Sequence, residues 1–173
     1  MKVLIVIDMQ KDFVNGALGT AEAESIVPKV AQKIASFDGE VFYTRDTHME
    51  NYLETQEGKN LPVVHCVKNT PGWQIVPELS PETEDRIINK PSFGSLELPG
   101  KLKDLEEEKG EPVTQITLIG LCTDICVISN AMILKAAFPE VPISVDASCC
   151  AGVTPESHER ALEAMKMCQI AVE

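Results

Sequence analysis

A cysteine at the start of an expected helix is the residue of this chain best placed for covalent chemistry. The apolar residues 116–119 have strand character and lead through Gly120 into a segment that we expect to be helical over 123–137. Cys126 falls in the first turns of that helix. There the positive end of the helix dipole and free backbone N–H groups favour a thiolate and can hold a developing oxyanion. We therefore expect Cys126 to be a nucleophile.

Two charged residues follow other expected strands. Asp8 comes directly after the apolar run 3–7, and Lys90 comes directly after residues 86–89. Ligands of open α/β sheets bind at the carboxyl ends of parallel strands. We therefore expect Asp8, Lys90 and Cys126 to gather at one edge of a sheet, where a carboxylate, a cation and a thiol suit nucleophilic catalysis.

Alternating strands and helices must position these residues. The expected strands are 2–7, 40–45, 86–89, 113–119, 141–145 and 168–172, and the expected helices are 22–36, 96–108, 123–137 and 155–167. Continuous apolar runs are typical of strands that are buried on both faces, and the intervening helices supply the crossovers. We predict a single doubly wound (Rossmann-like) α/β domain over residues 1–173, with a mostly parallel central sheet of about six strands flanked by helices.

Composition and charge exclude several classes of function. Fifteen basic and 27 acidic side chains in 173 residues give a formal net charge of -12, which opposes binding to nucleic acid and anionic membranes. The acidic run 104–108 is most simply a solvated helix face. The apolar run 3–7 is too short for a secretion signal or a membrane span. We expect a cytoplasmic protein that acts on a small molecule, and homo-oligomer formation stays open.

The six cysteines do not indicate structural disulfides. They are scattered along the chain, and none forms a Cys-x-x-Cys pair. In a reducing cytoplasm we expect them to be free thiols, so that Cys126 is available for chemistry.

The long connection 46–85 carries a second group of chemically capable residues. A connection of this length without clear periodicity is usually functional. It contains Asp46, His48, Glu57 and His65, and the first two emerge at the same sheet edge as Asp8. Two imidazoles and two carboxylates suit Zn²⁺, Fe²⁺ or Mn²⁺. From spacing alone, a polar surface loop is the simpler interpretation.

Four short blocks span nearly the whole chain. They are VIDMQKDF at 6–13, YTRDTH at 43–48, KPSFGS at 90–95 and GLCTDICV at 120–127. In this order they resemble the isochorismatase-like cysteine hydrolase superfamily, and most of all its nicotinamidase branch. The D-x-Q-x-D-F opening and the G-x-x-T-D-x-C-V segment are the most specific parts of the resemblance.

The resemblance implies a role for each catalytic candidate. Asp8 would be the base, Cys126 the nucleophile, and Lys90 the cation that favours the thiolate and orients Asp8. The backbone N–H groups of Cys122 and Cys126 would form the oxyanion hole, and a cis peptide would precede Cys122. The chain is thereby expected to use a covalent cysteine mechanism.

The resemblance also implies a metal and a substrate wall. Asp46, His48, His65 and Glu57 would coordinate one divalent transition metal, for which zinc is the first choice and Fe²⁺ or Mn²⁺ are alternatives. Phe13 would border the substrate ring. The metal interpretation thus gains support that spacing alone does not provide.

The expected activity is that of a cysteine-dependent amidohydrolase, which cleaves a small carboxamide through a thioester. Nicotinamide, giving nicotinic acid and ammonia, is the favoured substrate. Three features depart from the nicotinamidase pattern: Met49 replaces a proline, Pro62 replaces an aromatic three residues before His65, and the block 90–95 lacks a tyrosine. A carbamoyl or ureido substrate is therefore the enzymatic alternative. The non-enzymatic alternative is a thiol redox sensor or metal-binding module on the same scaffold.

Overall fold

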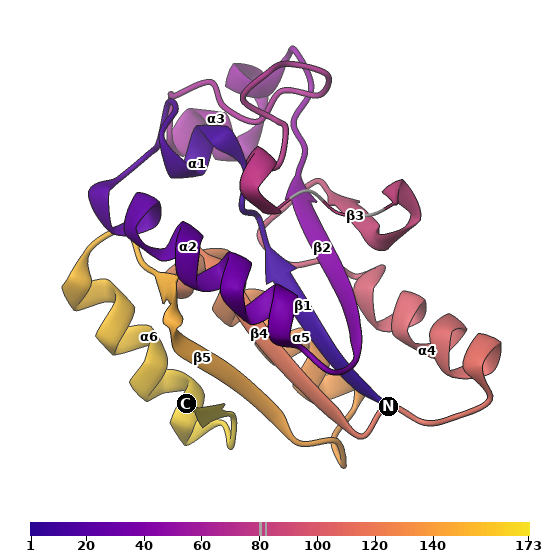
Figure 1. Cartoon of the computed structure of the whole chain (residues 1–173). Coiled ribbons are helices and arrows are strands. Elements are labelled where there is room, and N and C mark those ends of the chain that lie inside the picture. Colours follow the sequence, from indigo (N-terminus) through magenta and orange to yellow (C-terminus); the bar gives the residue numbers. More distant parts are fainter. Residues whose placement is uncertain (80, 82) are drawn as a thin grey trace.

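The computed structural model describes residues 1–79, 81 and 83–173 (Figure 1). Its centre is a six-stranded sheet in the order β3-β2-β1-β4-β5-β6, and all the strand pairings are parallel. The strands are β1 (Lys2–Ile7), β2 (Glu40–Asp46), β3 (Ile87–Lys90), β4 (Gln115–Leu121), β5 (Ile143–Ala151) and β6 (Ala171–Val172). The predicted single doubly wound α/β domain is confirmed.

Helices cover both faces of this sheet. The long helices are α2 (Ala21–Ser36), α4 (Leu98–Lys109), α5 (Ile128–Ala137) and α6 (Pro155–Met167), and the short ones are α1 (Lys11–Val14) and α3 (Gln56–Asn60). Alternate side chains of β1 enter two different hydrophobic clusters. Val3 and Ile5 pack with residues of α4, α5 and α6, whereas Leu4 and Val6 pack with residues of α2. This two-sided burial is why β1 is apolar at each position from Val3 to Ile7.

The order of the strands creates a switch point beside β1. From β1 the chain proceeds to β2 and β3 on one side, and it returns at β4 to build β5 and β6 on the other. The crevice outside the carboxyl ends of strands at such a point is where α/β folds bind ligands. The connection between β2 and β3 lies above these carboxyl ends in Figure 1.

Several expected boundaries are shifted by up to three residues in the structure, and three differences are larger. The connection between β2 and β3 is not structureless, because it holds α3 and three 3₁₀ turns, Tyr52–Glu54, Pro77–Leu79 and Glu84–Arg86. The strand expected at 141–145 continues to Ala151, because a register shift against β4 lets pairing resume at Gly120. The helix expected over 123–137 begins with a π-helical turn, Thr123–Val127.

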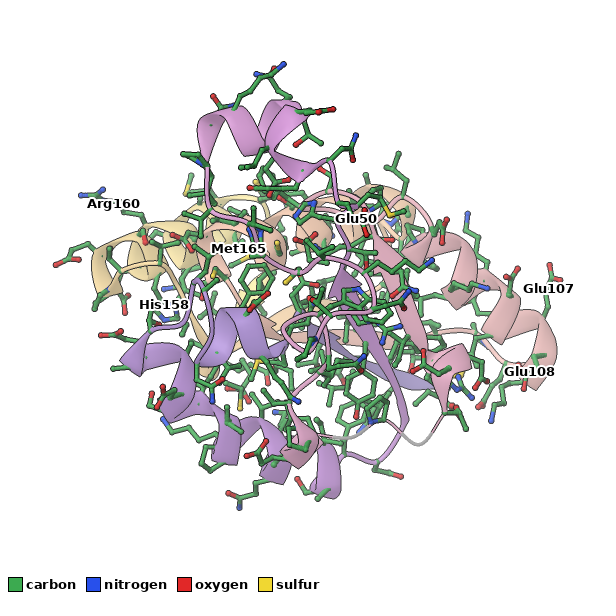
Figure 2. All side chains as sticks on the ribbon, turned by 90° about the horizontal axis from the view of Figure 1, so that it is seen from above. Glu50, Glu107, Glu108, His158, Arg160 and Met165 are labelled. Carbon is green, nitrogen blue, oxygen red and sulfur yellow. The ribbon has the colours of Figure 1, made fainter. Side chains whose placement is uncertain are left out.

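Three expectations from the composition can be compared with the structure. Glu107 and Glu108 are exposed on α4 and point away from the molecule in Figure 2, as a solvated helix face requires. In the described part of the chain, the helices are too short or too polar to cross a membrane. All six cysteines, each within the described residues, are free thiols.

Candidate active site

Asp8 lies at the point where β1 ends, and its side chain is fully buried. Its φ of 46° places it in the left-handed region, which aspartate tolerates better than most residues. The backbone N–H of Asp8 donates to the carbonyl oxygen and to Oγ1 of Thr44, both at 3.2 Å. The hydroxyl of Thr44 in turn donates to Asp8 Oδ1 at 2.7 Å. The carboxylate is thereby fixed by β2 through Oδ1, and its second oxygen, Oδ2, faces Lys90.

Lys90 is the last residue of β3 and is also fully buried. Its Nζ lies 2.6 Å from Asp8 Oδ2 and 3.2 Å from Asp46 Oδ1. It also donates to the carbonyl oxygen of Ser92 at 3.0 Å and to Cys126 Sγ at 3.5 Å. Burial lowers the pKa of Lys90, but the neighbouring acidic groups outweigh it and raise the pKa above the usual lysine value. Lys90 is therefore a buried ammonium that touches the thiol.

Cys126 lies in the π-helical turn that follows β4, and only 5% of its surface is exposed. Single π turns of this kind occur frequently at functional sites. The carbonyl oxygen of Cys126 accepts a hydrogen bond of 2.8 Å from the side-chain amide of Asn130. The peptide bond between Leu121 and Cys122 is cis, as the family resemblance implied. The structure thus brings Asp8, Lys90 and Cys126 together.

The charge state of this cluster differs from the expectation at one point. Lys90 lowers the pKa of the Cys126 thiol as expected, but burial and the nearby Asp8 raise it by more, so the net shift is upward. Cys126 is therefore a thiol at rest. Burial also raises the pKa of the Asp8 carboxyl against the opposing effect of Lys90. A buried carboxylate of raised pKa is a stronger base, which suits it to take the proton from the thiol.

A second cluster lies beside the thiol. The ligand atoms of Asp46, His48, Glu57 and His65 all lie within 4.8 Å of one another. His48 Nε2 lies 2.9 Å from Asp46 Oδ2 and 3.4 Å from Glu57 Oε1. His65 Nε2 lies 3.8 Å and 3.7 Å from the same two oxygens. The long connection and the end of β2 therefore bring the four predicted ligands to one point.

The chemistry of this cluster fits a divalent transition metal. His65 Nδ1 lies 2.7 Å from the carbonyl oxygen of Val63, to which it can only donate, so Nε2 is left to face the cluster. His48 Nε2 is buried and makes no hydrogen bond of good geometry among the described residues, although carboxylate oxygens surround it. Two imidazoles with two carboxylates are ligands that Zn²⁺, Fe²⁺ and Mn²⁺ accept. Burial lowers the pKa of His48, but Asp46 and Glu57 raise it to about 9. Protonated His48 can therefore balance the negative charge of these two carboxylates.

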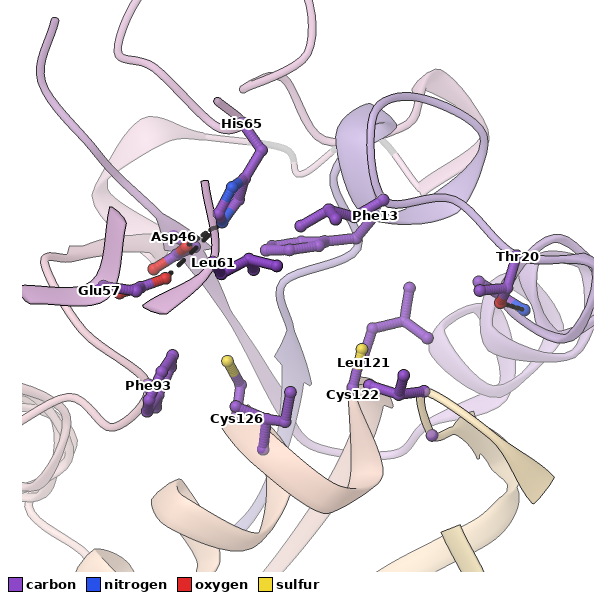
Figure 3. Close-up of a pocket in the computed structure, with 15 residues that line it drawn as sticks. Phe13, Thr20, Asp46, Glu57, Leu61, His65, Phe93, Leu121, Cys122 and Cys126 are labelled. Carbon is purple, nitrogen blue, oxygen red and sulfur yellow. Dashed lines mark hydrogen bonds and ion pairs between the residues drawn. The ribbon is translucent and has the colours of Figure 1, made fainter. Parts of the chain in front are cut away.

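A cavity of about 250 Å³ connects the two clusters (Figure 3). Its lining residues are Phe13, Leu18, Thr20, Ala23, Asp46, Glu57, Leu61, His65, Phe93, Leu121, Cys122, Ile125, Cys126, Gly152 and Val153. Phe13 lies beside His65, with 5.4 Å between the ring centroids, and faces the cavity as expected. Apart from Asp46, Glu57 and His65, the side chains of this list are uncharged. The cavity therefore suits a small molecule with an apolar body.

Sequence reasoning missed several residues of this site. Leu61 lines the cavity four residues before His65, close to where the branch has an aromatic, and Phe93 lines it from the block after Lys90. Gln10 clamps the main chain of Asp46, since its Nε2 donates to the carbonyl oxygen at 2.8 Å and its Oε1 accepts the N–H at 2.7 Å. The D-x-Q spacing is the signal that could have indicated Gln10.

Comparisons with known proteins agree with this geometry. The chain is similar to the pyrazinamidase of Pyrococcus horikoshii solved in complex with zinc, with a TM-score of 0.82, 31% identity, and coverage of 99% of this chain and 98% of that one. It is similar to the nicotinamidase/pyrazinamidase of Bacillus subtilis, with a TM-score of 0.77, 27% identity and 99% coverage of both chains. It is 26% identical to the nicotinamidase of Schizosaccharomyces pombe over 98% of this chain and 91% of that protein.

The family assignment extends over almost the whole sequence. The Isochorismatase family model, described as the isochorismatase domain, matches residues 2–173. The resemblance carried by the four sequence blocks is therefore confirmed, as is the prediction of an enzyme that hydrolyses amide C–N bonds. This chain belongs to the isochorismatase family, in its nicotinamidase-related branch.

Proposed function

We propose that the protein hydrolyses a small, neutral, aromatic carboxamide, nicotinamide before others, to the acid and ammonia. The observation that carries the proposal is the cavity that holds the Cys126 thiol and the His65 side of the second cluster within one apolar enclosure. A planar ring beside Phe13 can direct its carboxamide toward Cys126 while its ring nitrogen faces the cluster. Relatives that are named nicotinamidase and pyrazinamidase support this choice.

The first chemical step is attack by Cys126. Asp8 accepts the thiol proton, and Sγ forms a bond to the amide carbon while the carbonyl π electrons move to oxygen. The backbone N–H groups of Cys122 and Cys126 hold the resulting oxyanion. Lys90, which donates to Sγ, stabilises the negative charge as the proton leaves.

The second step releases ammonia. Protonated Asp8 returns its proton to the leaving nitrogen, the C–N bond breaks, and a thioester to Cys126 remains. Asp8 then removes a proton from a water molecule, whose oxygen attacks the thioester carbon. Collapse of this second intermediate breaks the C–S bond and releases the acid, and protonated Asp8 returns its proton to Sγ, which restores the thiol. Asp8 thus serves as base and acid in each half of the reaction, which its raised pKa favours.

The metal role follows from the donor set. Asp46, His48, Glu57 and His65 would hold one divalent ion, with zinc as the first choice and Fe²⁺ or Mn²⁺ as alternatives. A bound ion supplies a site for the ring nitrogen, directly or through water, and so helps to orient the substrate. Phe13 restricts the ring to the plane that directs its carboxamide to Cys126.

Carbamoyl amino acids are less suitable substrates. Their carboxylate would need a cationic partner, and the described residues that line the cavity include neither lysine nor arginine. The acidic side chains there, Asp46 and Glu57, would repel an anion unless a metal neutralised them. A neutral ureido compound remains an alternative that the test below distinguishes.

The predicted cytoplasmic location and the oligomeric state remain predictions.

The test is a panel of substrates with metal-loaded protein. We expect kcat/KM for nicotinamide and pyrazinamide to exceed that for benzamide, which lacks a ring nitrogen. Equal values for benzamide and nicotinamide would remove the proposed role of the ring nitrogen. Activity confined to a ureido compound would replace the carboxamide proposal.

A further inference from the structure

We propose that Asp12 is a positioning residue for the metal centre. Its carboxylate holds the main chain of Cys66, and Cys66 links the two histidines of the cluster. This inference rests on the proposed metal site, but it concerns a residue that lies outside the four ligands. It assigns a function to the second aspartate of the D-x-Q-x-D-F segment.

The contact is a short hydrogen bond between distant parts of the sequence. Asp12, in α1, accepts the backbone N–H of Cys66 at Oδ2, with a distance of 2.8 Å. Its other oxygen, Oδ1, lies 3.5 Å from the backbone nitrogen of Ala17. A hydrogen bond from an N–H group to a carboxylate is stronger than one to a neutral oxygen. Asp12 therefore fixes Cys66 firmly.

Cys66 connects both histidines to this hydrogen bond. It directly follows His65, so its nitrogen belongs to the peptide bond that His65 begins. Its carbonyl oxygen accepts the backbone N–H of His48 at 3.0 Å, and Lys68 donates back to the carbonyl oxygen of His48 at 2.9 Å. The main-chain atoms of His48 and His65 are therefore tied together through one residue, which Asp12 holds.

The conformation of Cys66 shows why it needs an anchor. Its φ is 47°, in the left-handed region that non-glycine residues seldom adopt, and the residue is fully buried. Without Asp12, its N–H would be a buried donor in need of a new partner. The segment would then relax toward a more favourable φ and carry His65 with it.

Gly72 packs directly against the carboxylate of Asp12 and leaves no room for a side chain of its own. A Cβ on Gly72 would come within 2.2 Å of Cγ, Oδ1 and Oδ2 of Asp12. The backbone N–H of Asp12 donates to the carbonyl oxygen of Gly72 at 3.0 Å. Phe13, the next residue, lies against the His65 ring, with 5.4 Å between centroids. Asp12 is thus held on one side by Gly72, and on the other it braces the His65 segment.

The test measures zinc affinity by chelator competition in the whole chain. Groups that orient metal ligands typically contribute about 10-fold to 100-fold in metal affinity. We expect Asp12→Ala to weaken zinc binding by at least about 10-fold, and Asp12→Asn, which keeps one acceptor oxygen, to weaken it less. Gly72→Ala should reproduce the loss by displacing the carboxylate while Asp12 is retained, which covers the case in which Asp12→Ala does not fold.

Two further measurements separate positioning from a general loss of stability. In metal-free protein, Asp12→Asn should accelerate hydrogen exchange at the backbone amides of Cys66 and His48 above the exchange elsewhere. The control is Asp146→Ala, because the Asp146 carboxylate also accepts a backbone N–H, from Ser148 of β5 at 3.1 Å, and pairs with Lys33 at 2.8 Å without lining the cavity. It should keep the zinc affinity even where it lowers the melting temperature.

The outcomes distinguish this inference from the proposed function. Unchanged zinc affinity in Asp12→Ala and Gly72→Ala, or affinity losses that match those of Asp146→Ala at equal loss of stability, would overturn the role of Asp12 alone. Wild-type protein that binds zinc in an Asp12-dependent manner but releases no ammonia would contradict the proposed function alone. Wild-type protein without affinity for divalent ions would overturn the metal site and with it the role of Asp12, and ammonia release from nicotinamide would still test the proposed function separately.

Discussion

The ammonium group of Lys90 lies 3.2 Å from Oδ1 of Asp46. The other oxygen of the same carboxylate, Oδ2, lies 2.9 Å from His48 Nε2. Asp46 therefore contacts both Lys90, which belongs to the group around the Cys126 thiol, and His48, which belongs to the proposed metal site. Because these side chains are buried, water and salt screen their interactions only weakly. A change of charge in one cluster must therefore alter the electrostatic interactions of the charged groups in the other.

Removing the Cys126 thiol should abolish turnover. We expect Cys126→Ala to lower ammonia release by at least about 1,000-fold with the fold retained, because the proposed thioester cannot form. The matched control is Cys168→Ala, which removes an exposed thiol that does not line the cavity. Ammonia release and circular dichroism measure the two effects. Near wild-type activity in Cys126→Ala would show that the nucleophile is another group.

Replacing Lys90 should affect stability as well as catalysis. Lys90→Ala leaves the buried carboxylates of Asp8 and Asp46 without their cation, and an unpaired buried charge costs about 3–5 kcal/mol. We expect urea denaturation to show a loss of this size and kcat to fall sharply. Combination with Asp8→Asn should recover part of the stability but none of the activity. Additive losses of activity in the double variant would mean that the two residues act independently.

The pH dependence should report the state of Asp8. Asp8 must be ionised to accept the thiol proton, so kcat/KM should fall as pH drops through its pKa. Burial raises that pKa from the ordinary value of 3.8, so the acid limb of the profile should lie at higher pH than an exposed aspartate would give. A profile of kcat/KM against pH for the wild type measures this. A limb at or below pH 3.8 would contradict the assignment of Asp8 as the base.

Metal binding should depend on two of the three histidines. We expect purified protein to hold close to one divalent transition ion per chain, and His48→Ala or His65→Ala to lose it. His158→Ala is the matched control, because His158 Nδ1 lies 2.7 Å from Thr123 Oγ1 and its ring is outside the cluster. Elemental analysis measures the metal content. Full metal content in both His48→Ala and His65→Ala would place the ion elsewhere.

The sequence predicted the scaffold better than the walls of the cavity. β1 was predictable because burial on both faces requires apolar residues, which occupy each position from Val3 to Ile7. Helices α2 and α6 begin with threonine caps whose side chains accept Ala23 N–H and Ser157 N–H. The placement of Asp8 and Lys90 at one edge of the sheet was predictable because the carboxyl ends of parallel strands meet there. Their charge states were not, since burial depends on the whole fold.

The wall residues could not be assigned from local patterns. Leu61 reaches the cavity only because α3 and the turn after it bring it there, and Tyr52 packs its ring 4.6 Å from that of His48 through the same connection. Neither has a periodicity or a motif of its own. Such contacts depend on the path of the connection between β2 and β3, which the sequence indicated only as long and functional.

The aromatic wall of the cavity should determine how tightly an aromatic amide binds. Phe13→Leu removes the ring that lies beside His65, and a stacking contact contributes about 0.5–1.5 kcal/mol beyond buried area. We therefore expect KM for nicotinamide to rise by about 2-fold to 10-fold with a smaller change in kcat. The control is Phe37→Leu, since Phe37 packs against the hydrophobic cluster between α2 and the sheet and does not line the cavity. Steady-state kinetics with nicotinamide and an aliphatic amide measure the difference. Equal effects on both substrates would show that Phe13 supports the fold and does not bind the ring.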